Sequence, residues 1–127
     1  MKKLFTPVFI AILIGSFTAQ ADESYNHFPA VASTDIHSAF CNIQSYNQKL
    51  TAITSKQTLS AQDMVKVHEL TYTLENALKL LKLRLDTAAE ELEKVHIASE
   101  KLEQNTIQSA GNIYLSITTS LLTNKQC

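Results

Sequence analysis

The stretch that decides the fold is residues 60–103, SAQDMVKVHELTYTLENALKLLKLRLDTAAEELEKVHIASEKLE. No glycine or proline interrupts residues 57–110, and apolar or small side chains recur there at alternating steps of three and four. This pattern is typical of a helix with one continuous apolar seam, as in a coiled coil. It predicts a long central helix over about 61–103. The seam consists of Met64, Val67, Thr71, Leu74, Leu78, Leu81, Leu85, Ala88, Leu92, Val95, Ser99 and Leu102.

The central helix has a clear start signal and one competing signal inside it. Ser60 and Asp63 have the spacing of a capping box, in which each side chain bonds to the backbone N–H of the other residue. A second start signal lies at Asp86 or Thr87, with Glu90 three residues after Thr87. A reversal there would split the helix, but an unbroken heptad phase across a reversal would be a coincidence. We therefore expect one continuous helix.

Shorter helices are predicted on both sides. Capping residues at 33–35 and apolar side chains at helical spacing predict a helix over about 34–56. After the central helix the apolar phase shifts by one residue, which places a break near 103–106 with Asn105 or Thr106 as the cap. The new stripe predicts a helix over about 106–122. Gly111 lies inside it, where glycine costs about 1 kcal/mol relative to alanine but can allow a close helix approach.

These elements predict an all-α fold. We expect an antiparallel bundle of three helices around the long coiled-coil-like one, or of four helices if that one bends near Asp86. At about 1.5 Å per residue, the two outer helices together match the central helix in length, so each would fold back against half of it. The helical domain would cover residues 34–127. Residues 22–33, which include Pro29 and have no clear period, would form an extended lead-in.

The first 21 residues have the features of a secretory signal peptide. Lys2 and Lys3 precede a short apolar stretch, and Ala19-Gln20-Ala21 is an A-x-A cleavage site. The alternative is an uncleaved anchor, but the apolar stretch is short for a span, which needs about 20 apolar residues. We expect a periplasmic chain with no membrane segment after cleavage. The net charge of −1 argues against a nucleic-acid binder.

Cys41 and Cys127 are the two cysteines of the chain. They form no C-x-x-C motif, which argues against a thioredoxin-like site. In an oxidising compartment a pair is first a disulfide candidate. In the expected arrangement the end of the last helix returns towards the start of the first, so an intramolecular bridge is favoured. An intermolecular bridge and free thiols remain the alternatives.

The middle of the central helix is apolar on nearly every side. Such a helix is buried on several sides, which fits a crowded bundle centre or a contact with another molecule. We therefore predict a non-enzymatic protein-interaction or self-association module, whose partner is an unknown protein or a second copy. No motif for nucleophilic catalysis or phosphate binding is present. The candidate interaction residues are Leu78, Leu80, Leu81, Leu83 and Leu85.

The alternative prediction is a small metal- or haem-binding bundle with His68 or His96 as a ligand. Glu93 and His96 have the spacing of half a di-iron motif, but such a site needs two copies and two further carboxylates. On one straight helix the two histidines lie about 42 Å apart, so they could meet only across a dimer. Met64, on the apolar seam, is more simply a core residue than a haem ligand. We expect no cofactor.

Two segments carry a family resemblance. Residues 68–78, HELTYTLENAL, and residues 95–100, VHIASE, resemble blocks of a family of small secreted bacterial helical proteins of unknown function. The resemblance extends over roughly residues 34–122. It implies a helical periplasmic protein and supplies no catalytic residues. It puts forward five positions for mutation: Thr71, Tyr72, Glu75, Asn76 and His96.

Overall fold

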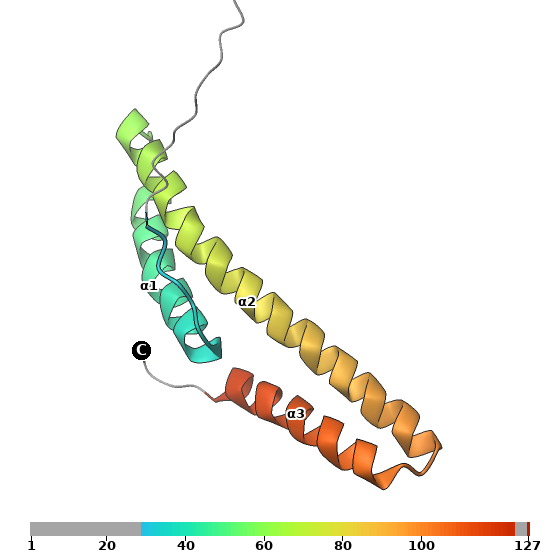
Figure 1. Cartoon of the computed structure of the whole chain (residues 1–127). Helices are drawn as coiled ribbons and strands as arrows, with labels where there is room; N and C mark the ends of the chain where they lie inside the picture. The colour runs from blue at the N-terminus through green and yellow to red at the C-terminus, as the bar shows by residue number, and fades with distance from the viewer. Residues whose placement is uncertain (1–28, 124–126) are drawn as a thin grey trace, which may run out of the picture.

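The chain forms three antiparallel helices, of which the middle one is twice as long as its neighbours (Figure 1). The computed structural model describes residues 29–123 and 127. The helices are α1 (Ile36–Thr54), α2 (Ala61–Glu100) and α3 (Gln104–Leu122), and these residues contain no strand. α1 packs on the first half of α2 and α3 on the second half, while α1 and α3 scarcely touch each other. The predicted three-helix, all-α architecture is confirmed.

The long helix α2 is continuous over 40 residues, about 60 Å. The helix passes through Asp86 without a break, and the Thr87 hydroxyl donates to the backbone oxygen of Leu83 within the same helix (2.9 Å). The competing start signal at Asp86 and Thr87 is therefore not used. A residue that can cap a helix can also sit inside one when its hydroxyl bonds to the preceding turn.

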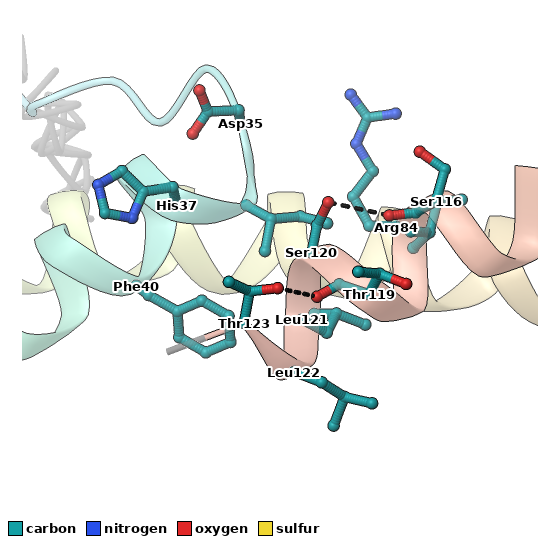
Figure 2. A pocket seen from close by; sticks show the side chains of 12 residues that line it. Asp35, His37, Phe40, Arg84, Ser116, Thr119, Ser120, Leu121, Leu122 and Thr123 are labelled. Carbon is teal, nitrogen blue, oxygen red and sulfur yellow. Dashed lines mark hydrogen bonds between the residues drawn. The ribbon is translucent and has the colours of Figure 1, made fainter. Parts of the chain in front are cut away.

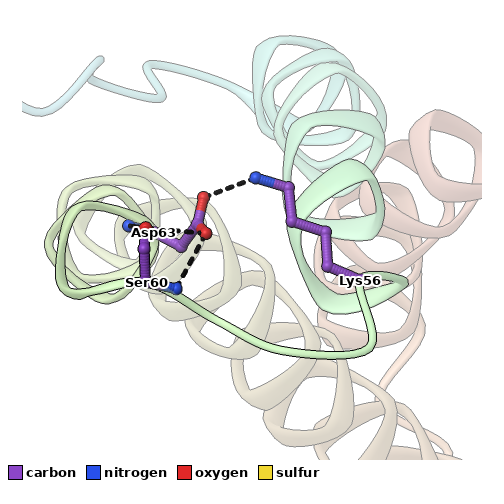
Figure 3. Close-up of polar contacts among 3 residues, drawn as sticks. All are labelled: Lys56, Ser60 and Asp63. Atoms are coloured by element: carbon purple, nitrogen blue, oxygen red, sulfur yellow. Dashed lines mark hydrogen bonds and ion pairs between the residues drawn. The ribbon is translucent and has the colours of Figure 1, made fainter.

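The corner between α1 and α2 contains the predicted capping box (Figure 3). The Asp63 N–H donates to Ser60 Oγ (3.1 Å), and Asp63 Oδ2 accepts from the Ser60 N–H (3.0 Å) and hydroxyl (2.9 Å). Lys56, beyond the end of α1, donates to Asp63 Oδ1 at 2.6 Å. The hydrogen bond from Lys56 and those from Ser60 lower the pKa of Asp63 to about 2. This carboxylate therefore ties the end of α1 to the start of α2.

A second capping box starts α1. The Ser38 N–H donates to Asp35 Oδ1 (2.7 Å), and Ser38 Oγ accepts from the Asp35 N–H (3.0 Å). The backbone hydrogen bond from Ser38 is the main cause of the lowered pKa of Asp35. α1 begins at Ile36, two residues after the predicted start, because Asp35 is the capping residue chosen from the three candidates at 33–35.

The turn between α2 and α3 differs from the prediction. The backbone of Leu102 adopts a left-handed conformation (φ 56°), and the Glu103 N–H reaches back to the carbonyl of Ala98 (2.9 Å). This geometry ends a helix in a tight turn and is usually made by glycine. Because the turn is so short, α3 begins at Gln104. The expected caps Asn105 and Thr106 lie inside α3, and Glu103 takes the cap position without a side-chain hydrogen bond.

The core lies where the start of α1 and the end of α3 meet the middle of α2. Ile36, Ala88 and Ile117, one from each helix, form a buried cluster, and partly buried side chains pack around it. Several of the buried positions are alanines, which let the helix backbones approach closely. The outer side chains of the cluster are Leu80, Leu81, Tyr114 and Leu121. The fully or nearly fully buried alanines are Ala39, Ala77, Ala88, Ala98 and Ala110.

Gly111 does not make the close approach that its position suggested. A Cβ atom built on Gly111 would lie 3.8 Å from Val95 Cγ2, an ordinary van der Waals distance. The space between α2 and α3 at this level therefore accepts an alanine without displacement.

The end of the lead-in is fixed to the helices. The Val31 N–H donates to Thr73 Oγ1 (3.0 Å), and the Asn42 side chain donates to the Ala32 carbonyl (3.3 Å) and the Ser33 hydroxyl (3.0 Å). The expected signal peptide, residues 1–21, lies outside the described residues. Among those that are described, no helix has the length and apolar character needed to span a membrane.

Candidate functional site

One side of α2 carries leucines that are about half exposed in the described chain. The seam of α2 consists of two rows, each repeating every seven residues. We call the row of Met64, Thr71, Leu78, Leu85, Leu92 and Ser99 the outer row, and the row of Val67, Leu74, Leu81, Ala88 and Val95 the inner row. The exposed fractions of Leu78, Leu85 and Leu92 are 58%, 52% and 45%, whereas Leu74 and Ala88 are buried.

The two rows differ because both outer helices lie on the same side of α2 (Figure 1). The buried residues of α2 include Leu70, Ala77, Glu91 and Ala98, which lie on the far side of the inner row from the outer row. The buried face is therefore turned away from the centre of the seam. Met64, expected to be a core residue, is 59% exposed for this reason.

The five leucines predicted as an interaction patch point in three directions. Leu81 packs against the core cluster, and Leu80 is partly buried against the same cluster. Leu80 and Leu83 line a shallow hollow of about 460 Å³ beside Ala32 and Ser33 of the lead-in. Only Leu78 and Leu85 lie on the outer row, which Leu92 continues. Leu83, on another side of α2, is 61% exposed.

Four charged residues beside the outer row change sign at Leu85: Lys79 and Lys82 come before it, and Asp86 and Glu93 come after it. Glu75, also beside the row, lies before both lysines, and all five side chains are exposed. The described ion pairs of α2 join Lys66 to Glu69, Lys94 to Glu91 and His96 to Glu100, and α2 also receives Lys56 at Asp63. Within residues 29–123, none of these pairs uses the five charges beside the outer row.

A larger hollow of about 780 Å³ lies where α1 and α3 meet end to end over α2 (Figure 2). Its lining combines apolar side chains with His37, Arg84 and a series of hydroxyl groups. The Ser120 hydroxyl donates to the Ser116 carbonyl (2.9 Å) and the Thr123 hydroxyl to the Thr119 carbonyl (2.6 Å). These hydroxyls therefore satisfy the backbone of their own helix. The apolar lining consists of Ile36, Phe40, Ile117, Leu121 and Leu122.

The disulfide closes the fold next to this hollow. Cys41 of α1 and Cys127 are bonded with their Cα atoms 5.3 Å apart, which confirms the predicted intramolecular bridge. The His37 ring lies one helical turn before Cys41, with Nε2 3.7 Å from its sulfur. Because α1 and α3 share few direct contacts, this bond is the main link between the two outer helices.

The metal candidates are far apart and have other neighbours. His68 contacts Tyr72, with 3.0 Å between Nε2 and the phenol oxygen, and His96 Nε2 lies 3.6 Å from Glu100. On the continuous α2 the two histidines are about 42 Å apart. Glu93 is exposed. Across the described part of the chain, no group of three histidine, cysteine, aspartate or glutamate side chains is arranged to hold a metal ion.

Sequence reasoning missed Thr73 and Asn42, which hold the lead-in. Thr73 is 1% exposed and accepts the Val31 N–H. The sequence did contain a signal for Thr73. This polar residue lies on the same side of the helix as Leu70 and Ala77, and that side is buried in the structure. Of the positions raised by the family resemblance, Thr71 donates to the His68 carbonyl (2.8 Å), while Glu75 and Asn76 are exposed.

The chain belongs to a family described as "Family of unknown function (DUF6746)", whose match covers residues 1–123. This finding agrees with the expected membership of an uncharacterised family. Neither the curated proteins nor the solved structures contain a match to the chain.

Proposed function

We propose that this chain is a non-enzymatic helical protein of the periplasm that binds a protein partner through the outer row of α2. Leu78, Leu85 and Leu92 carry the proposal, because each is about half exposed in the middle of a rigid helix. Singly exposed leucines are common on protein surfaces, but three half-exposed leucines aligned on one side of a helix favour an interaction site. The stripe spans about 21 Å along α2, which is long enough for the side of a partner helix.

The compartment is part of the same proposal. Residues 1–21 would direct export and be removed after Ala21, and the Cys41–Cys127 bond would form in the oxidising space beyond the inner membrane. The disulfide supports this assignment because such bonds are rare in reducing compartments.

A photo-crosslinking experiment tests the proposed function. A photoreactive amino acid is placed at Leu85 in the full chain, expressed in the organism that encodes it, and the cells are irradiated. Leu115 is the matched control, because it is also a leucine in a helix, on α3, and is 57% exposed. We expect one discrete adduct from position 85 and none from position 115.

The contrary result is equally clear. If positions 78, 85 and 92 all fail to give an adduct, or if position 115 gives the same adducts as position 85, the outer row is not an interaction site. The mass of any discrete adduct also separates a second copy of the chain from another protein.

A further inference from the structure

The partner on the outer row can be identified from the symmetry and charge of α2 itself. Leu78 and Leu92 lie seven residues before and after Leu85, about 10.5 Å away on each side. A second α2 running in the opposite direction, related by a two-fold axis at Leu85, would therefore place Leu85 against its own copy. It would also place Leu78 against Leu92 twice. Such a self-complementary patch is what a two-fold dimer requires.

Four charges beside the row have the same symmetry with opposite sign. Lys82 lies three residues before Leu85, and Asp86 and Glu93 lie one and eight residues after it. In the antiparallel pair each Lys82 would lie opposite position 88 of the other copy, two residues from Asp86. Each Lys79, six residues before Leu85, would lie opposite position 91, two residues from Glu93. Glu75 would lie opposite position 95, next to His96. A parallel pair would instead bring lysines to the level of lysines and carboxylates to the level of carboxylates.

The charges are available for such a contact. The ion pairs described for residues 29–123 use neither of these lysines and neither Asp86 nor Glu93. All four side chains are exposed and lie away from the inner row that α1 and α3 cover, so a partner helix could approach them. Lys79, Lys82 and Asp86 also line the hollow beside Ala32 and Ser33 of the lead-in. Charged residues at the rim of an apolar contact set its orientation and suppress wrong partners.

We infer that the occupant of the outer row is a second copy of this chain, in an antiparallel dimer with its two-fold axis at Leu85. This inference rests on the proposed function and names its partner. The leucines would supply the apolar contact, and the lysine and carboxylate blocks would select the antiparallel orientation.

Charge reversal tests the dimer and its orientation together. Sedimentation equilibrium on the oxidised mature chain at low salt gives the dissociation constant. We expect Lys79→Glu/Lys82→Glu to weaken the dimer by about tenfold or more, because four ion pairs become repulsive. Asp86→Lys/Glu93→Lys should do the same. Lys49→Glu/Lys101→Glu, which makes the same change in net charge away from the row, is the control and should leave the dissociation constant unchanged.

Mixing the two charge variants gives the decisive result. The first variant carries carboxylates on both sides of Leu85, and the second carries lysines on both sides. Neither variant should dimerise well alone, but in an antiparallel pair each would meet opposite charges on the other. The mixture should therefore form a heterodimer. The same reasoning predicts that Leu85→Cys forms a disulfide between two copies on oxidation, whereas Leu115→Cys does not.

The outcomes separate this inference from the proposed function. A wild-type chain that stays monomeric, while position 85 crosslinks to a different protein, overturns the dimer and leaves the proposed function standing. The antiparallel arrangement is overturned if neither charge variant changes the dissociation constant of the dimer, or if the two variants do not associate when mixed. A monomer with no adduct from the outer row overturns both proposals.

Discussion

Breaking the Cys41–Cys127 bond should remove a large part of the stability of this protein. The bond closes a loop of 86 residues, which contains nearly all of the three helices. In the chain-entropy description, cross-linking a loop of that length stabilises the folded state by about 4.5 kcal/mol at 25 °C, through restriction of the unfolded chain. Small domains have total stabilities of about 5–15 kcal/mol, so this loss is large enough to bring the chain close to unfolding.

The structure adds a second consequence. α1 contacts the first half of α2 and α3 contacts the second half, and the shared core cluster of Ile36, Ala88 and Ile117 is small. Without the disulfide, either outer helix can detach while the other stays packed. The unfolding transition should therefore become less cooperative, with a smaller dependence of the unfolding free energy on urea concentration.

Urea titration followed by far-ultraviolet circular dichroism measures both effects. The oxidised mature chain is compared with the same chain after reduction, so that the covalent bond is the only difference. The variant Cys41→Ala/Cys127→Ala should match the reduced chain. A loss of less than about 1 kcal/mol, with an unchanged slope, would refute the reasoning, because it would show that loop closure does not limit the unfolded chain here.

Three further predictions concern single positions and use the same titration. Gly111→Ala should stabilise the chain by about 1 kcal/mol, because the new methyl group would only touch Val95 at an ordinary distance; a destabilised variant would contradict the open space there. Leu102→Gly should stabilise the chain by about 1 kcal/mol, because glycine adopts the left-handed conformation without strain. Leu102→Ala, which keeps the Cβ atom, should change the stability little. If both variants had the same effect, the loss of the exposed leucine side chain would be the cause instead of the backbone conformation. Asp63→Asn should weaken the corner with Lys56. The pKa of Asp63 is lowered from 3.8 to about 2, so its contribution is present above about pH 4 and is lost towards pH 2. The difference between wild type and variant should shrink over that interval, and a constant difference would contradict the assignment.

The long helix was predictable because its signals are local and agree with one another. The heptad phase, the capping box at Ser60 and Asp63, and the lack of glycine or proline all indicate α2. The end of that helix was less predictable. Leu102 takes a conformation that normally calls for glycine, so no turn residue marks the point where α2 stops and α3 starts two residues early. Tertiary packing of α3 against α2 imposes the turn on an unsuitable residue.

The apolar surface of α2 was predictable in composition, but its direction relative to the other helices was not. A run of leucines between Leu78 and Leu85 shows that the middle of α2 is apolar all round, but the pattern cannot say which side the other helices take. That choice depends on the small residues: Ala77 and Ala98 are almost completely buried because helices approach closest where side chains are smallest. A heptad seam therefore locates apolar area, and the alanines beside it locate the intramolecular contact.

The same distinction explains why the outer row is left exposed. If leucines alone decided the packing, the two outer helices would centre on the seam and bury both rows. Instead, α1 and α3 lie over the alanines, and the row of Leu78, Leu85 and Leu92 is left half exposed. Leaving three leucines in water is unfavourable for an isolated chain, at roughly 25 cal/mol for each Å² of apolar surface that could have been buried. Because Lys79 and Lys82 precede Leu85 in the middle of this exposed row while Asp86 and Glu93 follow it, the proposed two-fold contact would bury the leucines and pair these four charges.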